Sequence, residues 1–157
     1  MKIRAFVSFD LDHDHDLELQ ICEQADGPNS RVDVFDRSFR EIAPDWHDKL
    51  RKRMSNVDLL IVLCGAYTDR AANVHAEFEL AREGRTPYVL LDGRPGLAER
   101  PATADTNDHL VQWNRHTLTT LGTAVAAGSS GEATDDNWLP STRLTHRRRR
   151  RAGRGSA

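Results

Sequence analysis

The fold of this chain is decided by the stretch Val57-Asp-Leu-Leu-Ile-Val-Leu-Cys64, followed by Val74-His-Ala-Glu-Phe-Glu-Leu-Ala81 and Pro87-Tyr-Val-Leu-Leu-Asp92. The first and third segments are apolar with little polar alternation, which is typical of strands buried on both faces in a parallel sheet. The middle segment has the periodicity of an amphipathic helix. We therefore predict a β-α-β unit over residues 57–92.

Glu77 is the acidic residue that this periodicity places beside the apolar face of the helix. Val74, Phe78 and Ala81 share one face of a helical wheel. Glu77 lies at the edge of that face, whereas Glu79 points the other way. One carboxylate is therefore directed toward the protein body near a helix start. A surface carboxylate without a function is the alternative interpretation.

The remaining segments extend the alternation of strands and helices. Strands are predicted over residues 2–9, 31–35 and 109–113, and helices over residues 44–55, 114–127 and a segment ending near Ala25. Such alternation indicates an α/β fold with a parallel sheet covered by helices on both faces. Five strands favour the flavodoxin-like order 2-1-3-4-5.

This order predicts where a ligand would bind. The switch point lies between the first and third strands, so the crevice is bordered by the loops at residues 10–16 and 64–73. Glu77 lies in the helix just behind the second of these loops. The helical wheel and the topology thus place Glu77 at the same expected ligand site.

Charge is distributed unevenly over the 157 residues. Residues 143–157 contain seven arginines and no acid, which leaves 15 Lys and Arg against 24 Asp and Glu before them, a balance of −9. We predict one domain over residues 1–127 and a disordered, Arg-rich tail over residues 128–157. An acidic body argues against nucleic-acid binding by the domain, and an Arg-tail nucleic-acid adaptor is a less favoured alternative.

Cysteine usage and hydropathy indicate a cytoplasmic protein. Cys22 and Cys64 are too few for a disulfide framework, so both are expected to be reduced and mostly buried. No signal peptide is visible, and no apolar run reaches the roughly 18 residues of a membrane helix. No membrane partner is expected.

The acidic loop at residues 10–16 contains His13 and His15. A calcium-binding EF-hand is excluded because His15 and Ile21 stand where glycine and glutamate are needed. We predict no metal and favour a capped helix start that lines a polar pocket, over a transition-metal site. No phosphate-binding glycine loop follows the first strand. Cys64 could be a thiol nucleophile, but nothing in the sequence places a base beside it.

Several segments together resemble the TIR-like domains of bacterial defence, with the TIR-like subunits of the Thoeris anti-phage system as the best match. The segments are Phe6-Val-Ser-Phe-Asp10, the strand from Val57, Val74 to Ala81, and Arg85-Thr-Pro-Tyr-Val-Leu90. The resemblance covers residues 1–92 and extends to about residue 127, through His109-Leu-Val-Gln-Trp-Asn114. It implies the flavodoxin-like fold and an enzyme that cleaves the nicotinamide–ribose bond of NAD. Many members cyclise the product to an ADP-ribose isomer that activates a partner effector.

The resemblance assigns roles to particular residues. Glu77, four residues before Ala81, matches the catalytic glutamate. The other substrate-binding candidates are Phe9, Asp10, Asp12, Trp46, Cys64 and His75. NAD is implied as the substrate, no cofactor is expected, and activation through a homo-oligomer is possible in the family. Asn73 stands where many NAD-cleaving members have tryptophan, and the alternative is a non-catalytic TIR-like module that binds proteins or a nucleotide.

Overall fold

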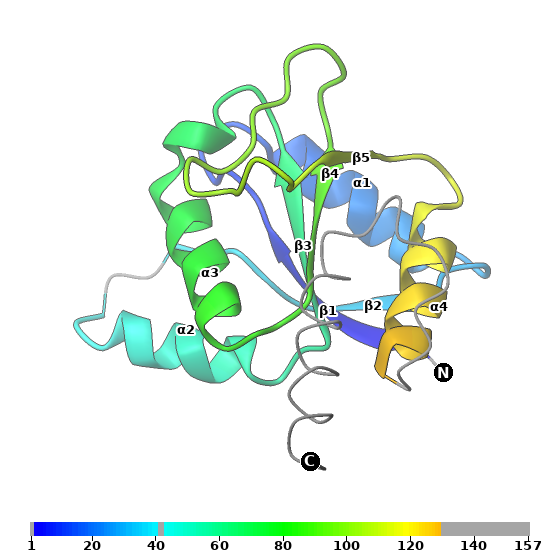
Figure 1. Ribbon diagram of the computed structural model, residues 1–157, viewed down its shortest axis with the longest axis horizontal. Coiled ribbons are helices and arrows are strands. Elements are labelled where there is room, and N and C mark those ends of the chain that lie inside the picture. Colours follow the sequence, from blue (N-terminus) through cyan, green and yellow to red (C-terminus); the bar gives the residue numbers. More distant parts are fainter. Residues whose placement is uncertain (1, 41–42, 130–157) are drawn as a thin grey trace, which may run out of the picture.

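Five parallel strands form the central sheet of the computed structural model, which describes residues 2–40 and 43–129 (Figure 1). The strands are β1 (Ile3–Ser8), β2 (Val32–Arg37), β3 (Leu59–Cys64), β4 (Tyr88–Asp92) and β5 (Leu110–Gln112). Their order is β2-β1-β3-β4-β5, and every pairing is parallel. The predicted flavodoxin-like α/β fold and strand order are therefore confirmed.

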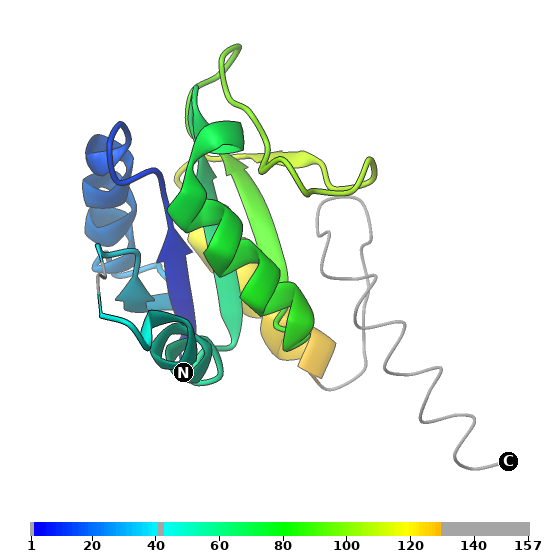
Figure 2. The ribbon, with the colours of Figure 1, turned by 90° about the vertical axis from the view of Figure 1, so that its left-hand side faces the viewer.

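Helices cover both faces of the sheet, as predicted. They are α1 (His15–Ala25), α2 (Trp46–Met54), α3 (Ala72–Glu83) and α4 (Thr117–Ser129), with a short 3-10 helix η1 (Thr68–Arg70) before α3. Figures 1 and 2 show α2 and α3 on one face and α1 and α4 on the other. In the described part of the chain, no helix is both long enough and apolar enough to cross a membrane.

The core consists of two apolar layers, one on each face of the sheet. All six residues of β3 are buried, which explains its unbroken apolar sequence. Leu59, Ile61 and Leu63 belong to the layer under α1 and α4. The intervening residues of β3 belong to the layer under α2 and α3, together with Phe78. The alternation of side chains along a strand therefore divides one apolar run between two layers.

Several element boundaries differ from the sequence prediction by a few residues, among them the following three. Strand β2 extends to Arg37 rather than ending at residue 35, because it continues to pair with β1 after a register shift. Helix α2 begins at Trp46, so Pro44 precedes the helix instead of opening it. Helix α4 continues to Ser129, two residues beyond its predicted end, so residues 128 and 129 of the predicted tail belong to the helix. The rest of that tail, residues 130–157, lies outside the described residues.

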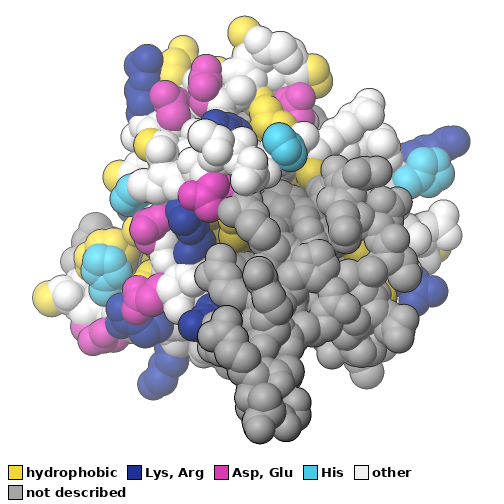
Figure 3. Space-filling model, viewed as in Figure 1, with side chains coloured by type: hydrophobic (Ala, Val, Ile, Leu, Met, Phe, Trp, Pro, Cys, Tyr) yellow, Lys and Arg dark blue, Asp and Glu magenta, His cyan; other side chains and the backbone are white. Residues whose placement is uncertain are grey.

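Acidic and basic side chains are interspersed over the side formed by α2 and α3 (Figure 3). Arg51 pairs with Asp48 within α2 and with Glu83 of α3, and Arg82 pairs with Glu79 within α3. Exposed pairs of this kind contribute little stability individually. The polar outer surface of both helices agrees with the amphipathic pattern of their sequences.

Candidate functional site

A cavity of about 710 Å³ lies at the carboxyl ends of the first three strands. Its walls come from the loops that follow β1, β2 and β3 and from α2 and α3. Ligands of open α/β sheets bind at this edge, beside the switch point between β1 and β3. The volume falls within the range of about 300–1,000 Å³ that is usual for ligand sites.

Glu77 of α3 lines this cavity although only 3% of the residue is exposed. Its Oε1 atom accepts hydrogen bonds from the hydroxyls of Ser8 and Ser38, each at 2.6 Å. Asn73 Nδ2 makes a longer contact with the same oxygen, at 3.5 Å. Within residues 2–40 and 43–129, no donor bonds to Oε2. One carboxylate oxygen is therefore fixed, and the other is available to a ligand.

The donors around Glu77 are held by two strands and a helix start. Ser8 is the last residue of β1, and Ser38 immediately follows β2. The Ser38 hydroxyl also accepts the Phe9 amide at 3.1 Å, while Asn73 donates to the Phe9 carbonyl at 2.8 Å. The backbone of Phe9 therefore fixes the positions of Ser38 and Asn73, two of the donors to Glu77.

Burial raises the pKa of Glu77 to about 7. Hydrogen bonds from Ser38 and Ser8, and the nearby charge of Arg53, oppose this shift because they favour the ionised form. Near neutral pH the carboxyl group is therefore present in both protonation states. A carboxyl group perturbed by burial and specific donors inside a cavity is typical of a functional residue.

Arg53 is a cavity residue whose charge is largely compensated. Its guanidinium forms a forked ion pair with Asp36, with Nε 2.7 Å from Oδ2. The same group lies over the ring of Phe39, 3.6 Å from its centroid. Arg53 therefore acts on Glu77 as a distant charge rather than as a direct partner.

Arg70 and Lys49 supply cationic groups that are less compensated by carboxylates than Arg53 is. Arg70 lies 5.9 Å from the ring centroid of Tyr67 and has no carboxylate partner among the described residues. Lys49 is 3.6 Å from Asp45, an exposed pair one helical turn away. Both side chains line the cavity and can therefore bind an anionic ligand.

Three residues predicted from the sequence lie with Glu77 around the cavity. Asp10 and Asp12 come from the loop after β1, and Trp46 comes from the start of α2. Asp10 is 3% exposed, whereas the Asp12 carboxylate lies at the surface and pairs with Arg40 at 2.7 Å. The structure thus brings together residues from three separate segments of the chain.

Phe9, Cys64 and His75 do not line the cavity, which corrects the expectation for them. Successive strand residues face opposite sides, so the Phe9 ring packs in the core under α1 instead, 5.5 Å from the His15 ring. Cys64 is fully buried in the core under α3. His75 lies on the exposed face of α3.

Burial also decides the chemistry of the Cys64 thiol. Desolvation raises the pKa of Cys64, and the charges of Asp92 and Asp14 add to the shift. The thiolate is the nucleophilic form of cysteine, and this environment suppresses it. The structure therefore offers no support for Cys64 as a nucleophile.

Ser8, Ser38, Tyr67 and Arg70 are site residues that sequence reasoning did not identify. Ser8 carries a usable signal, because a serine that ends a mostly apolar strand lies at the ligand edge of a parallel sheet. Ser38 carries none, since it lies in a stretch predicted as an ordinary polar loop. The positions of Tyr67 and Arg70 depend on the path of the loop after β3.

The loop at residues 10–16 opens α1 differently from the capped start that was predicted. Asp14 occupies the N-cap position without a side-chain capping bond. Its Oδ1 instead accepts a hydrogen bond from Arg94 at 3.2 Å, and its Oδ2 is buried without a partner in the described residues. Burial raises the pKa of Asp14, and Arg94 opposes the shift. Among the described residues, no three His, Cys, Asp or Glu side chains are arranged to hold a metal.

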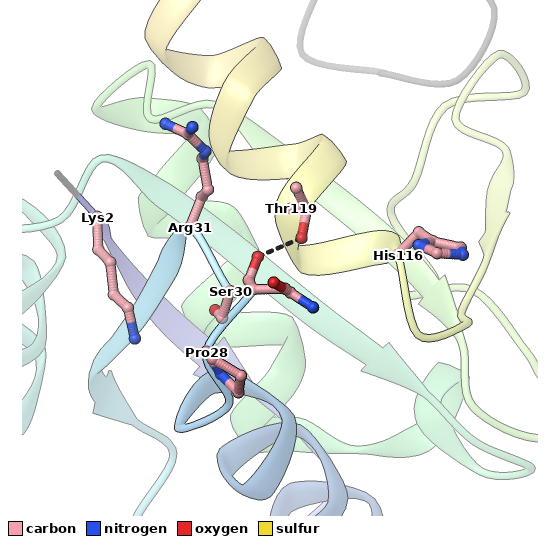
Figure 4. Close-up of a pocket in the computed structure, with 7 residues that line it drawn as sticks. Lys2, Pro28, Ser30, Arg31, His116 and Thr119 are labelled. Carbon is pink, nitrogen blue, oxygen red and sulfur yellow. Dashed lines mark hydrogen bonds between the residues drawn. The ribbon is translucent and has the colours of Figure 1, made fainter.

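A second cavity of about 470 Å³ lies near the amino ends of β1 and β2 (Figure 4). Lys2, His116 and Thr119 line it, together with residues 28–31. The Thr119 hydroxyl donates to the Asn29 carbonyl and ties α4 to the loop before β2. This cavity is separated from Glu77 by the length of the sheet.

No family model matches the chain, and no curated protein matches it. A solved structure that is similar in part is the Trypanosoma brucei CTPS glutaminase domain with bound acivicin. It is 23% identical with a TM-score of 0.37, and the match covers 59% of this chain and 37% of that chain. That neighbour is an enzyme domain, and acivicin binding is a property of that protein. The likeness to TIR-like domains rests on the sequence segments alone.

Proposed function

We propose that this protein is a TIR-like enzyme that cleaves the nicotinamide–ribose bond of NAD, with Glu77 as the catalytic residue. The product would be a cyclic ADP-ribose-type signal that activates a downstream effector in anti-phage defence. The observation that carries the proposal is the buried Glu77 carboxyl group, which lines the cavity at the switch point of the sheet.

The arrangement around Glu77 suits a reaction that passes through a cationic sugar. Cleavage of the bond to nicotinamide develops positive charge on the ribose, as in glycoside hydrolysis. A fixed anion at a buried position stabilises this charge more strongly than one in water. Ser8 and Ser38 hold Oε1, which leaves Oε2 to contact the ribose. The donors therefore preorganise the carboxylate before the substrate arrives.

Other walls of the cavity offer partners for the rest of a dinucleotide. Trp46 and Tyr67 provide aromatic surface for a base, and Arg70 and Lys49 provide charge for phosphates. Asn73 occupies the position where many NAD-cleaving members of the family have tryptophan, and it bonds to Phe9 and Glu77. We therefore expect the nicotinamide to stack on Tyr67 or Trp46.

The test is NAD turnover by the purified full chain, followed by chromatography and mass spectrometry. Nicotinamide release is expected, and the mass of the second product distinguishes cyclisation from hydrolysis. Assays at high protein concentration and with lysate from phage-infected cells cover activation by assembly or by a trigger. A preparation with Glu77→Gln excludes a contaminating enzyme. Binding of NAD without turnover under all these conditions would favour the non-catalytic nucleotide-binding module instead.

A second prediction concerns the pH dependence of this activity. Ionised Glu77 is the active form, so kcat/KM is expected to rise with pH through the pKa of about 7. Ser8→Ala removes a hydrogen bond to the ionised form and should move this rise upward by about one pH unit. Ser55→Ala is the matched control, because among the described residues that exposed hydroxyl bonds only to the Lys52 carbonyl. A rise at the same pH in both variants would contradict the role given to Ser8.

A further inference from the structure

Asp10 and His13 form a hydrogen-bonded pair on the wall of the cavity that contains Glu77. His13 Nδ1 lies 2.8 Å from Asp10 Oδ2. The Asp10 residue is 3% exposed, and its other oxygen accepts the Asp12 amide at 2.9 Å. The carboxyl group is therefore fixed by two bonds inside its own loop.

The backbone of the loop holds this pair rigidly. The amide groups of His13 and Asp14 both donate to the Asp10 carbonyl, at 3.3 and 2.9 Å. The His13 ring also lies against Tyr67 from the loop after β3, with the ring centroids 4.5 Å apart. The imidazole is thus held on one edge by Asp10 and on one face by Tyr67.

This geometry selects one tautomer of His13. A carboxylate only accepts hydrogen bonds, so the proton of the neutral imidazole lies on Nδ1. Nε2 then carries a lone pair, and no described residue bonds to it. Half of the side chain, 51%, is exposed, so a proton taken up at Nε2 can pass on to solvent.

We propose that His13 is a second catalytic residue of this cavity and that Asp10 is its positioning residue. The inference rests on the proposed function. When the ribose–nicotinamide bond breaks, its electron pair goes to the pyridinium nitrogen and neutral nicotinamide leaves. The oxygen of a hydroxyl acceptor, either water or a sugar hydroxyl of the substrate, bonds to the anomeric carbon. The proton of that hydroxyl goes to His13 Nε2 and then to solvent.

The proposal divides the chemistry between two sites on the cavity wall. Glu77 stabilises the cationic sugar through Oε2, because its Oε1 is already engaged by two serines. Capture by a neutral hydroxyl requires loss of a proton, and a positioned base contributes about 10²–10⁴-fold to such a step. The acceptor class is therefore one that carries an O–H group, because attack through a ring nitrogen of adenine needs no base.

The experiment compares His13→Gln and Asp10→Asn with the wild-type full chain, with and without sodium azide. His13→Gln is expected to slow product formation by about a hundredfold. Azide has no proton to lose, so it should restore nicotinamide release and yield a glycosyl azide visible by mass spectrometry. Asp10→Asn should show a smaller loss with the same rescue. His116→Gln, an exposed histidine at the other cavity, is the control.

Two results would overturn the assignment. One is a His13→Gln variant within about twofold of the wild-type rate. The other is a slow variant that azide does not restore. A purely structural role for His13 would produce that second result, because azide replaces only a missing base. Ring-nitrogen attack would produce the first result, because the cyclic product would then form equally well in both proteins.

A wild-type protein that releases no nicotinamide would refute the proposed function. The Asp10–His13 pair is then tested separately, through the tautomer of the His13 ring. Long-range proton–nitrogen NMR spectra at about pH 8, where a free imidazole is neutral, report both ring nitrogens of His13. Protonated Nδ1 and unprotonated Nε2, lost in Asp10→Asn, support a proton-accepting pair. A proton on Nε2 in the wild type would overturn it.

Discussion

Glu77→Gln is expected to slow nicotinamide release by at least about a hundredfold and, near pH 8, to stabilise the fold by about 3 kcal/mol. The activity falls because glutamine keeps the shape of the side chain but not the charge that stabilises the cationic sugar. The stability rises because the wild-type carboxyl group must ionise in a buried position. A single substitution is thus expected to lower the activity and to raise the stability of the fold.

The sign of the stability effect follows from the two pKa values. The pKa of Glu77 is about 7 in the folded protein, against an ordinary value of 4.5. Between these values the unfolded chain has lost its proton and the folded chain has kept it, so stability falls as pH rises. Below pH 4.5 this destabilising contribution of Glu77 is absent, and above about pH 7 it is constant.

Urea unfolding of both proteins at several pH values measures this effect. The difference between Glu77→Gln and the wild type should be near zero at about pH 4 and should grow to its full size by about pH 8. Glu79→Gln is the matched control, since its carboxylate lies on the exposed face of the same helix. Equal stability of Glu77→Gln and wild type at every pH would show that the carboxyl group is not buried as described.

Gly122→Ala is expected to destabilise the fold by about 2 kcal/mol. In an exposed helix the same change would stabilise by about 1 kcal/mol, because alanine is the better helix former. Here a Cβ atom would collide with the Arg31 Cβ and would lie 2.6 Å from the Arg31 carbonyl oxygen. Backbone cannot move as easily as a side-chain tip, so α4 must shift away from the loop before β2.

Thermal or urea unfolding detects this change, and the sign of the change in the free energy of unfolding is enough to test the prediction. Thr123→Ala is the control one residue further along α4, because Thr123 is exposed and its hydroxyl bonds to the Thr119 carbonyl of the same helix. Thr123→Ala should leave stability nearly unchanged. A Gly122→Ala protein more stable than the wild type would show that α4 does not pack this closely against Arg31.

Local pattern was sufficient for most of the fold. The unbroken apolar run of β3 requires burial on both faces, and the alternation of strands with helices requires a parallel sheet. The helical period alone directed Glu77 toward the protein body, and the structure buries it. Boundaries were less certain, because the end of β2 depends on its pairing with β1.

The environment of Glu77 was decided by tertiary structure. Ser8 and Ser38 are 69 and 39 residues away in sequence, so their bonds to Oε1 depend on the register of β1 with its neighbours. Alternation showed that Ser8 and Phe9 face opposite sides of the sheet but not which side receives α3. For this reason the site contains Ser8 and not the ring of Phe9.

The sequence by itself determined the order of strands and helices and the direction of Glu77 toward the protein body. These features arise from spacing along the chain, which the periods of strands, helices and turns convert directly into geometry. Only the tertiary structure decided which loops meet around the cavity, how deeply Glu77 is buried and where its pKa lies. Those properties depend on packing between segments that are distant in sequence, and short-range periodicity carries no record of that packing.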